Sequence, residues 1–188
     1  MRLRSATVLF PTSMHIPVRP SLLLLLCTMM LAVPMARADE AAAVRQLQAA
    51  GDHVAALARA VRALEARPKD AQMRFLRAVS LTELRRSDDA IAAFQSLTED
   101  HPELAEPYNN LAALYAAQGH YDKARAALEQ ALRSNPEYAL AHENLGDIYA
   151  ALATRSWGQA LQYAPDNRGV ATKLSIAREL LRAPSGSP

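Results

Sequence analysis

Cysteine is almost absent from this chain of 188 residues, which contains only Cys27. A disulfide needs two cysteines, so no internal disulfide forms, and the chain beyond residue 38 has no thiol chemistry. Glycine is also scarce, and the six glycines do not form a Gly-rich loop of the kind that binds phosphate groups. With 51% hydrophobic residues, the fold must instead depend on the packing of apolar side chains.

Aromatic residues and an excess of basic charge are lacking as well. Aromatic side chains make up 5% of the chain, too few for a surface on which nucleic-acid bases stack. The net charge of +2 at pH 7 comes from residues 1–38, which hold four of the 21 Lys and Arg residues and none of the 19 acidic residues. Residues 39–188 therefore carry 17 basic and 19 acidic residues. Without a basic stripe, we expect no nucleic-acid partner.

What the chain does have is a strict spacing of three prolines. Pro68, Pro102 and Pro136 are evenly spaced, and each follows a run of residues typical of a helix. Proline cannot continue a helix, because it lacks the backbone N–H and its ring crowds the preceding turn. The even spacing therefore predicts a repeated unit of about 34 residues, with units that begin near residues 37, 71, 105 and 139.

The residues between the prolines keep the same period. In the first half of each unit a small residue recurs, as Val44, Ala78, Ala112 and Gly146. Its packing partner recurs as Leu47, Leu81, Tyr115 and Tyr149. A second small residue recurs in the other half, as Ala56, Ala90 and Ala124. Because such positions are three or four residues apart within a unit, they fall on one face of a helix.

The unit that begins near residue 105 carries the pattern most completely. Its aromatic, small, bulky and turn positions are Tyr108, Leu111, Ala112, Tyr115, Gly119, Tyr121, Ala124, Leu128, Ala131 and Pro136. This resembles the tetratricopeptide repeat, a helix–turn–helix unit of the same length. The resemblance implies an all-α fold, a right-handed α-solenoid in which neighbouring units share a continuous core.

Two residues of the second unit depart from that pattern. Arg85 stands where Gly51 and Gly119 provide the turn in the neighbouring units, so it must bend without glycine's freedom at positive φ. Arg77 stands where Leu is usual. Either the first helix of this unit is slightly rotated, or the aliphatic stem of Arg77 lies along the core.

The fourth unit lacks the turn. Its proline, Pro165, comes five residues early, and no turn glycine separates two helices. The sequence predicts one long helix over residues 139–163 in place of the usual hairpin. Residues 166–183 are expected to form a capping helix with a charged outer face, and residues 184–188 a disordered tail. The repeat domain, residues 39–165, would comprise units 39–70, 71–104, 105–138 and the atypical 139–165.

Residues 1–38 have the layout of a secretory signal peptide. Basic residues precede an apolar run from residue 22 to residue 33, and Ala36 and Ala38 supply the small residues that a signal peptidase recognises. We expect cleavage before Asp39. The apolar run is short for a membrane span, which needs about 20 residues, and an uncleaved anchor is the alternative. A start at Met14 would give the signal a more typical length.

The expected location is the bacterial periplasm. Cys27 is interpreted as part of the apolar core of the signal, because Leu26 replaces the small residue that precedes the lipid-modified cysteine of a lipoprotein. If the N-terminal segment is not cleaved, it would anchor the chain to the membrane with the repeats facing the periplasm. No other membrane contact is expected.

No group of residues predicts catalysis. His142 and Glu143 begin like the helix of a zinc protease, but Gly146 stands where the second His must be. The other histidines beyond residue 38 lie at expected turns, helix ends or outward positions, and no Ser has the sequence context of a nucleophile. We therefore expect a protein that is not an enzyme, with no metal, cofactor or small-molecule substrate.

The resemblance to tetratricopeptide proteins implies that a partner binds in the concave groove lined by the first helix of each repeat. The predicted groove residues are Gln72, Phe75, Val79, Glu83, Glu106, Asn109, Ala113, Glu143 and Asp147. Their acidic and apolar character predicts a protein or peptide segment of basic character as the partner. The alternative is that the acids among them are ordinary solvated positions.

Together these features predict a scaffold for protein–protein interactions in the bacterial periplasm or cell envelope. One interpretation is an adaptor that holds envelope proteins through its groove. The alternative is a dedicated structural accessory subunit of one envelope machine, such as cytochrome maturation or peptidoglycan synthesis.

Overall fold

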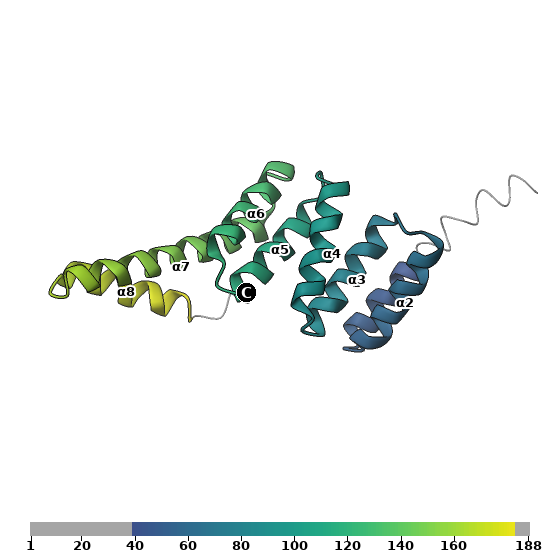
Figure 1. Ribbon diagram of the computed structural model, residues 1–188, viewed down its shortest axis with the longest axis horizontal. Helices are drawn as coiled ribbons and strands as arrows, with labels where there is room; N and C mark the ends of the chain where they lie inside the picture. Colours follow the sequence, from purple (N-terminus) through teal and green to yellow (C-terminus); the bar gives the residue numbers. More distant parts are fainter. Residues whose placement is uncertain (1–38, 183–188) are drawn as a thin grey trace, which may run out of the picture. The chain divides into compact units, whose positions relative to one another are not determined.

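The computed structural model describes residues 39–182, so the predicted signal peptide and the predicted tail lie outside the described residues. Every regular element in this part of the chain is a helix (Figure 1), which confirms the predicted all-α class. None of these helices combines the length and the apolar character needed to cross a membrane. The packing described below lies within one compact unit, Glu40–Pro188.

The helices follow one another through short turns. The described chain opens in a helix over residues 39–49. It is followed by α2 (His53–Ala66), α3 (Ala71–Glu83), α4 (Ser87–Asp100), α5 (Ala105–Ala117), α6 (Tyr121–Ser134), α7 (Ala139–Tyr163) and α8 (Arg168–Leu180). From α2 onward each helix packs on the next, and α5 also contacts α7. We call helix 39–49, α3 and α5 the first helices of their repeats, and α2, α4 and α6 the second helices.

The prolines mark the ends of the second helices, as predicted. The C-terminal caps of α2, α4 and α6 are Arg67, His101 and Asn135, and the next residue in each case is the proline. Asp70 then starts α3, because its side chain accepts a hydrogen bond from the Met73 N–H at 3.2 Å. The even spacing of the three prolines in the sequence is therefore also the spacing between the C-terminal ends of α2, α4 and α6.

The columns of small residues form the core of the three regular repeats. The members of these columns are almost completely buried: Val44, Ala78, Ala112, Ala56, Ala90 and Ala124. Small side chains let two helices approach closely, and larger ones fill the space beside them: Phe94, Leu97 and Leu128 are also fully buried. Burial of each such large side chain stabilises the fold by about 1.5–3 kcal/mol.

The fourth unit does not continue these columns. Gly146 is exposed, and a Cβ atom placed on it would meet no atom within 4 Å. Tyr149, its predicted packing partner, is 50% exposed. The prediction of close helix contact at these two positions is wrong, because α7 runs on without a turn and no second helix of that unit covers them.

Arg85 adopts the turn geometry expected of it. Its φ is +59°, close to the +78° of Gly51 and the +75° of Gly119 at the same position of the neighbouring repeats. A residue with a Cβ atom in this left-handed region costs roughly 1–2 kcal/mol. The second repeat therefore keeps the common turn at the expense of local strain.

The C-terminal helices have the predicted positions but not the predicted surface. Helix α7 is a single helix over the predicted residues, and α8 lies within the predicted segment and packs on α7 (Figure 1). Leu174 and Ala177 of α8 are buried. Ile176 and Leu180, however, are each 61% exposed, so the outer face of α8 is partly apolar and not purely charged.

Candidate partner-binding pocket on the first helices

A pocket lies where the first helices of the three regular repeats come together. Its volume is about 530 Å³, and it is formed by helix 39–49 and by the beginnings of α3 and α5. The lining residues are Arg45, Ala71, Gln72, Phe75, Leu76, Leu104, Glu106 and Pro107. We call this the first-helix pocket. Its walls are mainly apolar, and it carries one positive and one negative side chain.

Three of the nine predicted groove residues, Gln72, Phe75 and Glu106, line this pocket. Val79 is half-buried and packs against the core. Other predicted residues are exposed but lie outside the pocket lining: Glu83, Ala113, Glu143 and Asp147. The structure thus brings together the predicted residues at the beginnings of α3 and α5.

Asn109 is buried, although the groove prediction places it on the surface. Its exposed fraction is 6%, and its Oδ1 accepts a hydrogen bond from Nδ2 of Asn144 at 2.8 Å. This bond joins α5 to α7. Since a buried amide that is already paired is not free to meet a partner from solution, we expect Asn109 to hold α7 against α5.

Gln48 makes a comparable contact between helix 39–49 and α3. Its Nε2 donates to the carbonyl oxygen of Leu76 at 2.8 Å and lies 2.9 Å from Oγ of Ser80. These bonds join helix 39–49 to α3. Because Leu76 also lines the first-helix pocket, they fix one of its walls.

Phe75 forms another fixed wall. Its ring meets the ring of Phe94 edge to face, with the centroids 5.7 Å apart and an interplanar angle of 64°. Phe94 belongs to α4 and is fully buried. Such an aromatic pair adds about 0.5–1.5 kcal/mol beyond its area burial. A wall that is already ordered reduces the entropy that binding must overcome.

Three lining residues are absent from the predicted set: Arg45, Leu104 and Pro107. Arg45 stands one full repeat before Val79, so extending the groove column to the first repeat identifies it. Leu104 is the N-cap residue of α5, and Pro107 lies in the first turn, where a missing N–H breaks no helical hydrogen bond. Nothing in the repeat pattern marks these last two as pocket residues.

Glu106 is the acidic side chain that lines the pocket. Glu106 lies in the first turn of α5, where the helix dipole favours a negative charge. Burial, and then the charge of Glu106, raises the pKa of Tyr138. Further exposed acids on α3 and α7 have the same sign: Glu83, Glu143 and Asp147. Arg45 is the cation that lines the pocket.

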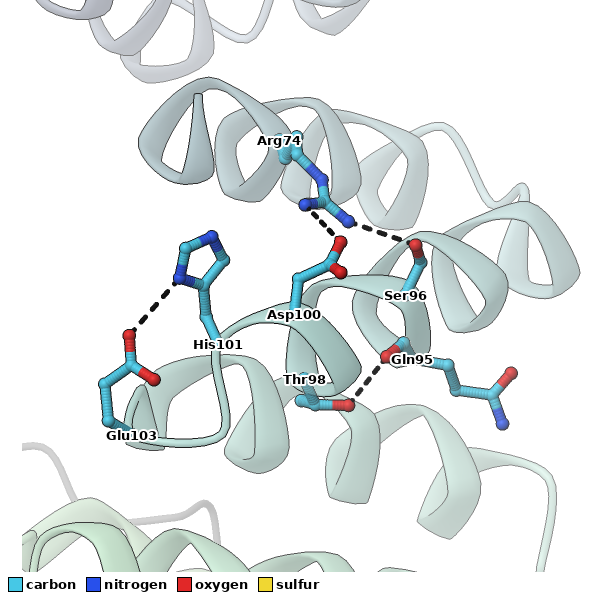
Figure 2. A network of polar contacts seen from close by, with 7 residues as sticks. All are labelled: Arg74, Gln95, Ser96, Thr98, Asp100, His101 and Glu103. Atoms are coloured by element: carbon cyan, nitrogen blue, oxygen red, sulfur yellow. Dashed lines mark hydrogen bonds and ion pairs between the residues drawn. The ribbon is translucent and has the colours of Figure 1, made fainter. Parts of the chain in front are cut away.

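Polar contacts join α3 to α4 and occur in the turn after α4 (Figure 2). Arg74 extends from α3 to Asp100 and Ser96 on α4, with nitrogen–oxygen distances of 2.7 and 3.0 Å. In the turn after α4, Nδ1 of His101 lies 3.2 Å from Oε1 of Glu103. A hydrogen bond from its own backbone N–H, and then His101, lower the pKa of the Glu103 carboxyl. These contacts fix the turn that leads into α5.

The pocket offers groups for recognition. Its polar side chains are the guanidinium of Arg45, the amide of Gln72 and the carboxylate of Glu106. Within residues 39–182, no three His, Asp or Glu side chains are grouped in a way that could hold a metal ion. The arrangement can bury an apolar side chain and pair with one charge of either sign.

Comparisons with known proteins identify the repeats. Sequence profiles of the family described as tetratricopeptide repeat match residues 38–105 and residues 84–137. The two matches together span residues 38–137, which contain the three regular repeats. No curated protein matches the sequence.

Solved structures share the fold at low sequence identity. The thermophilic tetratricopeptide protein TTC0263 of Thermus thermophilus is 22% identical with a TM-score of 0.55, over 74% of this chain and 97% of that one. The first tetratricopeptide domain of human RPAP3 is 18% identical with a TM-score of 0.59, over 62% and 92%. A tetratricopeptide protein of Parabacteroides merdae ATCC 43184 is 19% identical with a TM-score of 0.56, over 79% and 60%. At these identities the likeness shows the solenoid fold alone.

Proposed function

Since residues 38–137 belong to the tetratricopeptide repeat family, whose members generally mediate protein–protein interactions, we propose that this chain is a non-enzymatic adaptor. It binds a segment of a partner protein in the first-helix pocket. The observation that carries this proposal is the pocket itself, which has mainly apolar walls and three polar side chains. Fixed apolar walls with a few placed polar groups are typical of binding sites.

The chemistry of the pocket suits an apolar side chain next to a basic one. Phe75, Leu76 and Leu104 cover the apolar part, and Glu106 pairs with the basic part. Arg45 is then available to donate hydrogen bonds to main-chain carbonyl groups of the segment.

The proposed place of action is the bacterial periplasm. Its support comes from the sequence of residues 1–38, with basic residues before an apolar run and Ala36 and Ala38 before Asp39. In that compartment the adaptor holds proteins of the cell envelope together.

A charge reversal at the pocket tests the proposal. The tagged protein is expressed in its native bacterium and captured from the periplasmic fraction, where its N-terminal residue should be Asp39. The amount of partner captured should fall about tenfold for Glu106→Lys, because an attractive charge pair worth about 1.4 kcal/mol is replaced by a repulsive one.

Glu65→Lys is the matched control. Glu65 is an exposed acid of α2 outside the pocket lining, and its reversal changes the net charge by the same amount. It should capture as much partner as the wild type. Equal capture by the wild type and Glu106→Lys would overturn the first-helix pocket as the binding site.

A further inference from the structure

A second pocket lies between the second helices α2 and α4, with α3 beneath it. Its volume is about 390 Å³. Helix α2 contributes Leu57 and Val61, and α3 contributes Arg77 and Leu81. We call this the second-helix pocket. It shares no lining residue with the first-helix pocket.

Arg77 is unusual at its position in the repeat. The same position is occupied by Leu111 and Leu145 in the next two units, and Leu111 is only 4% exposed. The Nε atom of Arg77 is buried and has no hydrogen-bond partner among the described residues. A buried donor left without a partner costs about 1–3 kcal/mol, a cost that leucine does not have. The fold accepts leucine in neighbouring repeats, so it does not itself require this arginine.

The other polar groups of the second-helix pocket are already paired. Arg86 binds Oδ2 of Asp89 through Nε at 2.8 Å and through Nη2 at 2.7 Å. The hydroxyl of Ser96 accepts a hydrogen bond from Arg74 at 3.0 Å. Arg77 lines the same pocket, and its Nε has no hydrogen-bond partner in the described part of the chain.

We propose that the second-helix pocket binds an acidic side chain of a partner protein through Arg77. A guanidinium group binds a carboxylate with two parallel N–H···O hydrogen bonds, which the terminal nitrogens of Arg77 can donate. Leu57, Val61 and Leu81 then cover an apolar residue next to the acid. This proposal does not depend on the function proposed for the first-helix pocket.

Two short peptides that differ only in charge provide the test. Acetyl-Leu-Glu-Leu amide and acetyl-Leu-Gln-Leu amide are titrated into the ¹⁵N-labelled protein while the backbone amide shifts are recorded. The Glu peptide should shift amides of α2, α3 and α4 around Arg77. It should bind at least about tenfold more tightly than the Gln peptide, because hydrogen bonds to charged groups are the stronger ones. Equal affinities, or shifts confined to the first-helix pocket, would overturn the proposal.

Variants of Arg77 separate binding from folding. Arg77→Leu introduces the residue of the two following units, so the melting temperature should rise while the preference for the Glu peptide is lost. Arg77→Met, which is uncharged and of similar length, should lose the same preference and serves if the leucine variant does not fold. Glu137→Gln, at an exposed position outside both pocket linings, should leave both affinities unchanged. Undiminished preference for the Glu peptide in either Arg77 variant would show that Arg77 is not the binding group.

Discussion

The regular repeats and the C-terminal helix pair contain similar side chains but bury them differently. In the repeats, α4 and α6 hold Phe94, Leu97 and Leu128 away from solvent. In the C-terminal pair, Tyr163 of α7 is 90% exposed and Leu180 of α8 is 61% exposed. A helix of the repeats packs on the helix before it and on the helix after it, whereas α8 packs on α7. Burial in this fold therefore depends on stacking between units more than on the pattern of any one helix.

The largest effect that would test this comparison is expected for Phe94→Ala. The substitution removes a fully buried ring that packs on Phe75, which should cost about 3–5 kcal/mol of unfolding free energy. Because stacked repeats share a core, the loss should be felt across α3 to α6. Urea denaturation would measure the free energy, and hydrogen exchange would show which amides lose protection.

Leu174→Ala is the counterpart in the C-terminal pair. Leu174 is 6% exposed, so a buried side chain is again removed, but from α8. Exchange should accelerate in α8 and in the last turns of α7, while α3 to α6 keep their protection. If both substitutions accelerate exchange in the same amides, the C-terminal pair belongs to the same cooperative unit and the comparison fails.

A smaller effect on stability is expected from substitutions in the turn between the two helices of a repeat, where the second repeat has Arg85 and the third has Gly119. Arg85→Gly removes the strain of a left-handed Cβ but raises the entropy of the unfolded chain, so we expect a net gain of about 0.5–1 kcal/mol. Gly119→Ala should lose about 1 kcal/mol. A Cβ atom at Gly119 meets no atom within 4 Å, so this variant reports on backbone conformation alone. Thermal denaturation should give shifts of opposite sign, and shifts of the same sign would contradict the strain at Arg85.

The smallest effect is expected near the start of the repeats. Arg59 donates two hydrogen bonds to the Glu40 carboxylate, at 2.9 and 3.1 Å. These bonds lower the pKa of Glu40 below its ordinary value of 4.5, against a smaller opposing effect of burial. A lowered pKa in the folded state means that the pair stabilises the protein above the ordinary pKa, and that this contribution is lost as pH falls through the folded-state pKa. Both side chains are partly exposed, so the contribution is small.

Glu40→Gln should therefore lower the urea midpoint slightly at pH 7. The difference from the wild type should shrink as pH is lowered through the folded-state pKa of Glu40. Arg59→Gln, which removes the same pair from α2, should show the same dependence on pH. If the difference in urea midpoint between variant and wild type stayed constant over the whole pH range, the substitution would have removed packing contacts and not an ion pair.

Local chemistry explains why the helices and turns could be predicted from the sequence. The ends of α2, α4 and α6 follow from prolines, which cannot continue a helix. The positive φ of Arg85 follows from the glycines at the same position of its neighbours. The length of α7 follows from the missing turn glycine. Each of these features depends on a few adjacent residues.

Exposure could not be predicted in the same way, because it depends on which helix lies alongside. Gly146 and Tyr149 keep the period of a buried column, yet they are exposed where the fourth unit lacks its second helix. Asn109 has the register of a groove residue, yet Asn144, from the next unit along the chain, pairs with its amide. For the same reason the period suggested Phe75 for the groove but did not show that Leu104, the N-cap of α5, would close the pocket.

Helix α7 also limits the modularity of the repeats. In the regular repeats, each second helix packs on the first helix of the following unit. A duplicated repeat inserted ahead of Ala139 would meet the same kind of neighbour at both junctions. Beyond Ala139 this modularity stops, because the 25 residues of α7 extend for about 37 Å without a turn. Within residues 39–182, α7 is therefore the long helix that interrupts the alternation of first and second helices.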